Sequence, residues 1–407
     1  MTHKSGRHFL QLPGPSNVPE RVLRAISRAT IDHRGPEFRS LTERLLSELK
    51  WVFRTEHPVL VYPSSATGAW EAALTNTLSS GDRVLCFEQG FFAGKWATVA
   101  ERFGLDVQRT PWESRRAVTS DAVTDALRAD TKQLIKAVLL VHNETSTGVT
   151  SDVEAIGTAM RASGHPALLL VDTVSSLATT ELRHDDWGVD VTVSGSQKGL
   201  MLPPGLSFIA VGPRALEAHR VAKLPRSYWD WDDQLAFNER GFFPYTPATN
   251  LLYGLDEALK MLREEGLERV FERHARWAEA TRAAVSTWGL ETCALHAGEA
   301  SNALTAVQMP DGWDAEALRA MILERFDMSL GTGLGKLKGH VFRIGHLGDL
   351  NTLSLLGTLG GVEMGLGLAG VPHERGGVAA AMEFMTKEED HLMKEEELLM
   401  RKQRGDT

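Results

Sequence analysis

Short apolar segments alternate with helical patterns from about residue 58 onward. Seven of them have the apolar, β-branched character of strands, and several are apolar enough to be buried on both faces: PVLVYP (58–63), RVLCFE (83–88), DVQRTP (106–111), IKAVLLVHNE (135–144), ALLLVD (167–172), VTVSGS (191–196) and LSFIAV (206–211). The segments between them have helical patterns, at 68–79, 91–103, 120–129 and 152–163. Strands that alternate with helices predict an α/β fold with a doubly wound, mainly parallel sheet.

The pattern changes after about residue 250. Long amphipathic helices run from 250 to 289, and a mixed part follows that contains LTAVQMP, MSLGTGLG and HVFRIGHLG. This change predicts a second, smaller α+β domain, with the linker within 240–285. The predicted division is an N-terminal arm at 1–20, a large domain at 21–265, a small C-terminal domain at 266–385, and a charged C-terminal helix or tail at 386–407.

Composition narrows the classes of function. The 407 residues include 44 basic and 53 acidic side chains, which gives a formal net charge of −9. This balance argues against a broad surface for nucleic acid or an anionic membrane. Two cysteines, Cys86 and Cys293, are too few for a four-thiolate metal site or a disulfide framework, and no metal is expected. Because the sequence has no signal-like N terminus and no apolar run of about 18 residues, we expect a cytoplasmic protein without a membrane partner.

Polar residues that follow the strands are the first candidates for a site, because doubly wound sheets bind ligands beyond the carboxyl ends of their strands. The stretch PSSATGAWEAAL leads from a strand into a helix, and Ser65 and Thr67 there could bind a phosphate together with free N–H groups. The alternative is an ordinary helix cap. The stretch HNETSTGVTSD follows another strand and offers Thr145 as a donor, with a polar turn as the alternative.

Two charged residues complete this set. Asp172 ends an apolar run and is either a strand-ending cap or the negative partner of a cationic ligand atom. Lys198, in SGSQKGLMLPPGL, is either a surface charge or a desolvated, nucleophilic amine. Pyridoxal phosphate requires an anion site, a carboxylate against its pyridine nitrogen and a lysine for a Schiff base. The combination therefore predicts this cofactor and an amine substrate.

The ordered segments resemble the class-V pyridoxal-phosphate aminotransferases, specifically their serine–glyoxylate and alanine–glyoxylate branch. The resemblance covers nearly the whole chain and rests on LPGPSNVPERV, SATGAWEAALTNTLSSGDRVL, VHNETSTGVTSDV, HPALLLVDTVSS, GSQKGLMLPPGL, YTP and KGHVFRIGHLGDLN. It implies a fold-type I transferase, in which a large domain with a mainly parallel seven-stranded sheet is joined to a smaller C-terminal α+β domain. It also implies a homodimer with shared active sites, and leaves further association of dimers open.

The resemblance also implies residue roles. Lys198 forms the Schiff base, Asp172 pairs with the pyridine nitrogen, and Arg343 binds the substrate carboxylate, which suits a planar guanidinium. The other implied site residues are Ser65, Ala66, Thr67 and Gln197 at the phosphate, Phe92, Thr145 and Val174 around the ring, Gly14 in the substrate site, and Tyr245 and Thr246 at the phosphate of the neighbouring subunit. Relatives tend to have glycine where this chain has Ala66 and Thr173, and alanine is strained there only if its φ is positive.

The implied reaction is transfer of an amino group from an L-amino acid to glyoxylate, giving glycine and a 2-oxo acid. Serine, which gives hydroxypyruvate, is the expected donor. Alanine and aspartate are the alternatives, and aspartate would need a second cation such as Arg34 or Arg226. A lyase of the same fold, such as a cysteine desulfurase, is a weaker alternative because it would need a reactive cysteine near the site. A nucleotide site is excluded because Lys336 follows GTGLG where GxGxxG requires a glycine.

Overall fold

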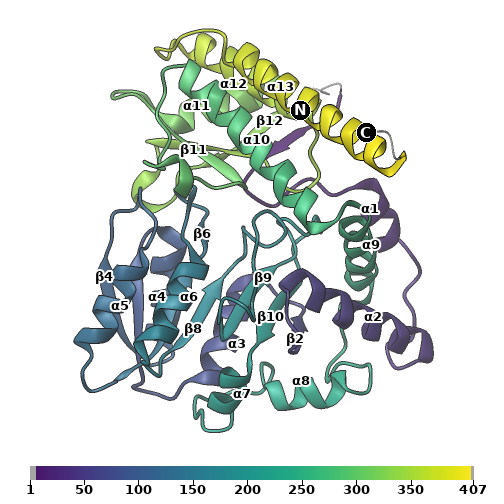
Figure 1. Cartoon of the computed structure of the whole chain (residues 1–407), viewed down its shortest axis with the longest axis vertical. Coiled ribbons are helices and arrows are strands. Elements are labelled where there is room, and N and C mark those ends of the chain that lie inside the picture. The colour runs from purple at the N-terminus through teal and green to yellow at the C-terminus, as the bar shows by residue number, and fades with distance from the viewer. Residues whose placement is uncertain (1–5, 405–407) are drawn as a thin grey trace.

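A seven-stranded sheet forms the centre of the larger of two domains (Figure 1). The computed structural model describes residues 6–404, with side chains described up to residue 390. The strand order is β2-β10-β9-β8-β5-β3-β4. Their bounds are β2 Val59–Tyr62, β3 Arg83–Glu88, β4 Asp106–Pro111, β5 Ile135–Val141, β8 Leu168–Asp172, β9 Val191–Gly195 and β10 Ser207–Val211. All seven predicted strands are present, and the predicted α/β fold is confirmed.

One strand of this sheet runs against the others. Strands β4, β3, β5, β8 and β9 pair in parallel, whereas β10 pairs antiparallel with both β9 and β2. The parallel strands are linked through crossover segments, but β9 leads to β10 through residues 196–206 alone, so the chain returns in the opposite direction. Lys198 lies in this connection, directly beyond the carboxyl end of β9.

Helices cover both faces of the sheet, and each face has its own hydrophobic core. One core involves α2, α5, α6 and α9, and the other involves α3, α4, α7 and α8. The four helices predicted between strands are present within one or two residues of the expected bounds. The bounds are α1 Glu20–Ile26, α2 Pro36–Phe53, α3 Ala66–Thr77, α4 Phe91–Arg102, α5 Ser120–Ala129, α6 Val153–Ser163, α7 Pro213–His219, α8 Trp231–Asn238 and α9 Thr249–Glu265, with the short hairpin β6 Asn143–Glu144 and β7 Val149–Thr150.

The smaller domain is built on a four-stranded sheet of order β1-β12-β13-β11. Its edge strand β1 (Phe9–Gln11) comes from the N terminus and pairs in parallel with β12, so the first and last parts of the chain share one sheet. Figure 1 shows this purple strand among the green ones. The other elements are α10 Leu267–Thr287, η1 Ala297–Glu299, β11 Leu304–Gln308, α11 Ala315–Phe326, β12 Met328–Thr332, η2 Gly335–Leu337, β13 Val341–Gly345, α12 Thr352–Ala369 and α13 Gly377–Arg404. Residues 405–407 of the predicted tail lie outside the described residues.

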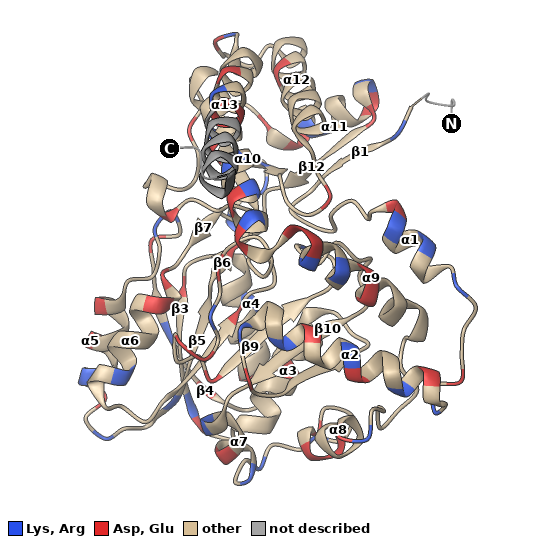
Figure 2. Cartoon of the chain, turned by 45° about the vertical axis from the view of Figure 1, so that its right-hand side comes forward, with Lys and Arg blue, Asp and Glu red and all other residues tan. Residues whose placement is uncertain are grey.

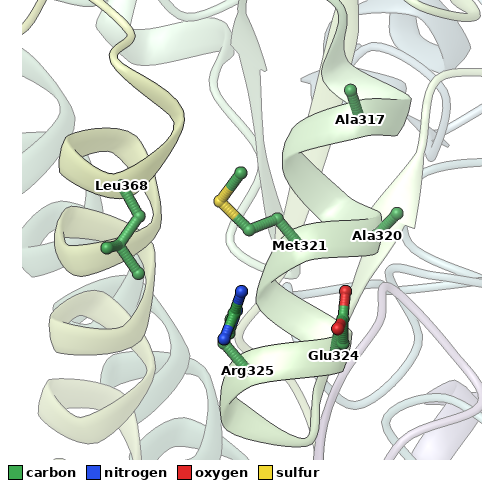
Figure 3. Close-up of a pocket in the computed structure, with 6 residues that line it drawn as sticks. All are labelled: Ala317, Ala320, Met321, Glu324, Arg325 and Leu368. Carbon is green, nitrogen blue, oxygen red and sulfur yellow. The ribbon is translucent and has the colours of Figure 1, made fainter.

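Among the described helices, α12 has the length and apolar composition that a membrane span needs, with a mean hydropathy of 1.3. It packs against α10, α11 and α13, and its Leu355, Leu359 and Val362 are fully buried in the core of the smaller domain. A cavity of about 540 Å³ separates parts of α11 and α12, and Met321 and Leu368 lie at its walls (Figure 3). None of the predicted site residues lines this cavity.

Acidic and basic side chains are interspersed over the elements of both domains (Figure 2). Many form surface ion pairs, such as Arg21 with Glu257 and Glu264. Exposed pairs of this kind contribute only about 0–1 kcal/mol each.

Candidate active site

Lys198 is buried where the two domains meet. Its Nζ donates a hydrogen bond to the carbonyl oxygen of Pro13, in the segment that follows β1. The same segment also holds the backbone of Lys198, because Ser16 Oγ donates a hydrogen bond to the Lys198 carbonyl oxygen at 3.1 Å. Gly14 has a φ of +106°, and a Cβ there would overlap the lysine side chain. Glycine is therefore required at this position both by the backbone conformation and by the close approach of the amine.

The surroundings of Lys198 favour its neutral form. Burial is the main cause and the charge of Arg343 adds to it, while Asp172 opposes both; together they lower the pKa of the amine to about 8. A lysine with an ordinary pKa near 10.5 is almost entirely protonated at neutral pH. A neutral amine is the nucleophilic form, so this environment prepares Lys198 to attack a carbonyl carbon.

Asp172 stands at the carboxyl end of β8 with both carboxylate oxygens bonded. Trp70 Nε1, from α3, donates to Oδ2 at 2.8 Å, and the backbone N–H of Val174 donates to Oδ1 at 2.7 Å. Burial raises the pKa of Asp172 to about 7 despite these donors. A cation beside the carboxylate would lower this pKa again, because an opposite charge at short range favours ionisation. Asp172 is thus fixed in place and suited to a cationic ligand atom.

The predicted phosphate site is the start of α3. The helix begins at Ala66, and Ser65 precedes it without a side-chain cap, so the first N–H groups and the positive end of the helix dipole are available to an anion. Gln197 reaches the same place: a Cβ at Gly195 would lie 3.0 Å from Gln197 Oε1 and 3.4 Å from the Cβ of Ala66. Among the described residues this buried Oε1 has no hydrogen-bond partner.

Neither departure from the family pattern is strained. Ala66 and Thr173 are absent from the non-glycine residues of positive φ. Ala66 therefore takes a helical conformation at no steric cost. Thr173 directs its hydroxyl to the carbonyl oxygen of Val193 at 3.0 Å, where it bonds to the neighbouring strand.

The smaller domain contributes Arg343, on β13, to the predicted site. This arginine is only 7% exposed, and burial lowers its pKa to about 10. Its Nη1 donates to the carbonyl oxygen of Thr145 at 2.7 Å and its Nε to that of Thr332 at 2.8 Å. Within the described residues Nη2 makes no hydrogen bond, so it remains available for a carboxylate. The hydroxyl of Thr145 is held by Ser175 Oγ at 2.7 Å.

Two predicted residues lie elsewhere, beside β2. The ring of Tyr245 stacks on Tyr228 at 4.3 Å and lies 6.4 Å from Tyr62. Its hydroxyl is buried without a hydrogen-bond partner in the described part of the chain, and burial raises its pKa. Thr246 lines a surface cavity of about 330 Å³ together with Thr30. In the described part of the chain, the ring contacts of Tyr245 are with Tyr228 and Tyr62 and not with residues around Lys198.

His219, Asp230 and Asp232, around α7 and α8, form a group of potential metal ligands among the described residues, with ligand atoms within 4.8 Å of one another. Asp230 is already engaged, since Oδ2 accepts from Arg226 Nε at 3.0 Å and Oδ1 from the N–H of Asp232 at 2.9 Å. A cation at this place would compete with the guanidinium. None of the predicted site residues belongs to the group.

Residues 8–334 match the class-V aminotransferase family. The chain belongs to this family.

The aminotransferase aligns over most of its length with relatives of named activity. It is 48% identical to the serine–glyoxylate aminotransferase of Methylorubrum extorquens, over 94% of this chain and 97% of the relative. It is 45% identical to the L-aspartate–glyoxylate aminotransferase of Paracoccus denitrificans, over 91% of this chain and 94% of the relative. The solved structure of ureidoglycine–glyoxylate aminotransferase from Bacillus subtilis superposes with a TM-score of 0.87 at 29% identity, over 95% of this chain and 100% of that one. The fold-type I architecture is confirmed.

Pyridoxal phosphate is the cofactor of this aminotransferase, and the residues present fit it. The start of α3 offers free N–H groups and the positive end of its dipole to a phosphate, and the amide of Gln197, whose NH₂ group can donate, lies close to Ala66. The buried carboxylate of Asp172 lacks the cation that a protonated pyridine nitrogen would supply. Lys198 offers an amine with a lowered pKa. When bound, the cofactor supplies a carbonyl carbon for amino groups and an electron sink.

Glu144 is a buried carboxylate beside the predicted site residues Phe92 and Thr145, and the sequence analysis did not single it out. Its carboxylate is completely buried and accepts from the N–H groups of Phe92 and Ala93 at 3.1 Å, and from Ser146 Oγ at 2.7 Å. It therefore holds the start of α4, where Phe92 is expected to stack on the cofactor, against the loop that carries Thr145. Its position at the end of a buried strand was a usable signal, because a carboxylate there needs several donors.

Glu144→Gln should weaken cofactor binding. Glutamine keeps the length of the side chain, but its NH₂ group cannot accept hydrogen bonds from the start of α4, and bonds to a charged acceptor contribute about 1.5–3 kcal/mol. We expect the cofactor to dissociate at least about tenfold more readily, as measured by titrating the apoenzyme and following visible absorbance. The exposed Glu154→Gln on α6 is the matched control. Equal affinity in both variants would show that Glu144 does not position Phe92.

The pH dependence of cofactor uptake should report the amine of Lys198. Because its pKa is about 8 and the neutral amine reacts, the rate at which the apoenzyme gains colour should rise with pH and level off above about 9. A lysine of ordinary pKa, such as that in a short acetylated peptide, should keep gaining rate beyond pH 10. Stopped-flow absorbance across pH 6–11 makes the comparison. A profile without a plateau contradicts the assignment of the lowered pKa to Lys198.

Proposed function

We propose that the chain is a serine–glyoxylate aminotransferase, which converts serine and glyoxylate to hydroxypyruvate and glycine. The observation that carries the proposal is the 48% identity with a serine–glyoxylate enzyme over 94% of the chain. The single available guanidinium nitrogen of Arg343 and the amine of Lys198 support it, because a small amino acid needs one carboxylate partner and one base. No further charged partner is required for a hydroxymethyl side chain.

Each predicted site residue has a separate role in the proposed reaction. Arg343 orients the substrate by its carboxylate, so that the Cα–H bond faces Lys198. The amine of Lys198 would take the proton from the substrate Cα, and its protonated form would give a proton back, so that it acts as base and then as acid. Asp172 would hold the protonated pyridine nitrogen of the bound cofactor, whose ring supplies the electron sink. Burial excludes water from the proton that moves, since Lys198 and Asp172 are 9% and 3% exposed.

Aspartate is the second candidate donor, because the Paracoccus denitrificans relative is named for it. An aspartate side chain would need a second cation. Arg226 is unsuited, since its Nε binds Asp230 at 3.0 Å and its Nη1 binds the carbonyl oxygens of Thr75 and Ala222. The side chain of Arg34 is exposed, in the segment before α2. Arg34 is thus the remaining candidate for this role.

We also infer a cytoplasmic homodimer. The buried hydroxyl of Tyr245 has no partner among the described residues of its own chain, which supports a contact with the cofactor phosphate of a second subunit. A two-fold axis would give two equivalent shared sites. Both cysteines are buried as free thiols, which suits a reducing compartment. Tyr245→Phe should leave a dimer that retains cofactor less tightly.

The proposed function is tested by assaying the purified holoenzyme with glyoxylate and each donor in turn. We expect kcat/KM for serine to exceed that for aspartate and alanine by tenfold or more, which corresponds to about 1.4 kcal/mol of transition-state discrimination. Double-reciprocal plots should be parallel, because the amino group passes through the enzyme in two half-reactions. A higher kcat/KM for aspartate would replace serine as the donor, and Arg34→Gln should then remove that preference.

A further inference from the structure

A cavity of about 700 Å³ lies between the two domains. The large domain contributes residues from the start of α4, from the end of β4 and from the loop after Thr145. The smaller domain contributes residues 334–337. A Cβ at Gly335 would lie 3.3 Å from Phe91, so the two domains touch at the rim of the cavity. The volume is in the range of small-molecule sites, about 300–1,000 Å³.

This cavity adjoins the arginine that binds the substrate carboxylate. Arg343 is held by two backbone carbonyl groups, those of Thr145 and Thr332. The walls of the cavity include Ser146, next to Thr145 in the large domain, and Leu334, two residues after Thr332 in the smaller one. The cavity thus lies beside the two segments that hold the guanidinium in place.

The walls are cationic in a protein that is anionic as a whole. The lining includes Lys95, Arg109 and Lys336 but only one acidic residue, Glu88. Arg109 is neutralised by Glu88 at 2.8 Å and by Glu101 at 2.7 Å. Lys95 and Lys336 are exposed, and in the part of the chain that the structure describes neither forms an ion pair. One belongs to each domain, so the two free charges face the cavity from opposite sides, although the chain carries a net charge of −9.

We propose that this cavity is the entry vestibule for the carboxylate substrate, and that Lys95 and Lys336 concentrate anions there before Arg343 binds them. The proposal rests on the proposed function for the identity of the substrates. Clefts lined by one sign of charge raise the local concentration of an oppositely charged substrate and thereby its kcat/KM. Glyoxylate is a monoanion, whereas serine is a zwitterion without net charge. The vestibule therefore favours the acceptor and is indifferent to the donor.

The test is to remove the two charges and measure each half-reaction of the holoenzyme. The Lys95→Gln/Lys336→Gln double variant should lower kcat/KM for glyoxylate about threefold to tenfold at an ionic strength of about 10 mM, where the Debye length is about 30 Å. The kcat/KM for serine and the value of kcat should stay within about 1.5-fold of wild type. At about 150 mM, where screening acts within about 8 Å, the difference for glyoxylate should largely disappear.

The matched control is Lys132→Gln/Lys136→Gln. Both lysines are exposed at the amino end of β5, the edge of the sheet opposite to the site, and the net charge changes by the same amount. If the control lowers kcat/KM for glyoxylate as much as the vestibule variant does, the effect belongs to total charge and the proposal is wrong. It is also wrong if kcat/KM falls equally for serine and for glyoxylate, or if the vestibule variant equals wild type at low salt.

Failure of the proposed function would be detected separately, in the donor and acceptor assays of the wild-type enzyme. If aspartate is the donor, the same variants still test the vestibule, because aspartate is an anion and should lose kcat/KM along with glyoxylate. A wild-type enzyme that ignores glyoxylate contradicts the proposed function alone, and the comparison is then made with the anionic 2-oxo acid that it does use.

Discussion

Lys198→Ala should abolish the visible absorbance of the covalently bound cofactor and lower turnover by at least about 10³-fold. The amine is the nucleophile and the base, and acid–base catalysis alone contributes about 10²–10⁴-fold. No described side chain beside it offers a second amine, since Arg343 stays protonated with a pKa of about 10. Absorbance spectra and single-turnover kinetics with serine measure both effects.

Two controls separate this loss from a folding defect. The exposed Lys223→Ala should behave as wild type in both assays. Adding methylamine to Lys198→Ala should restore part of the turnover, because a small amine can occupy the space that the side chain leaves. Normal colour and turnover in Lys198→Ala would overturn the assignment of this lysine, and with it the mechanism.

Asp172→Asn should leave the fold intact and slow the half-reaction with serine by about 10²–10³-fold, the cost of removing one preorganised electrostatic partner. The amide has no negative charge to keep the pyridine nitrogen protonated. It also directs an NH₂ group at one of the two donors, Trp70 Nε1 or the N–H of Val174. The measurement is stopped-flow absorbance after mixing the enzyme with serine, with circular dichroism as the check on folding.

Trp70→Phe is the matched comparison for Asp172→Asn. It removes the 2.8 Å hydrogen bond to Oδ2 but retains the charge of the carboxylate. We expect a rate within about tenfold of wild type, because the lost bond orients the carboxylate whereas the lost charge drives the chemistry. Equal slowing in both variants would mean that the position of Asp172, and not its charge, governs the rate.

The sequence predicted the elements of the larger domain well because its signals are local. A parallel strand that is buried on both faces reads as a continuous apolar run, as LLLVD does, and the polar residue that ends the run marks the ligand edge. The same rule located Asp172 and the start of α3. The rule did not single out Glu144, because no local pattern shows that its carboxylate faces α4, about 50 residues away in the sequence.

Contacts between distant segments could not be predicted from the residues alone. Strand β1 has only three residues and pairs with β12 more than 300 residues later, so nothing in FLQ distinguishes it from a loop. The approach of Gly14 to Lys198 depends on that pairing, and only the family resemblance had pointed to Gly14. The place of Tyr245 depends on a second subunit and stays a prediction.

The segment that joins β1 to the large domain has a practical consequence. Residues 13–16 cover the amine of Lys198, yet they are anchored to the sheet of the other domain. An enzyme shortened by its first 16 residues would retain every catalytic side chain named above, but water would reach its lysine. The pKa of the amine would then rise toward its ordinary value, so that less of it would be neutral at pH 7 and capture of the cofactor would be slower. Expression tags and N-terminal truncations should therefore leave residues 13–16 in place over Lys198.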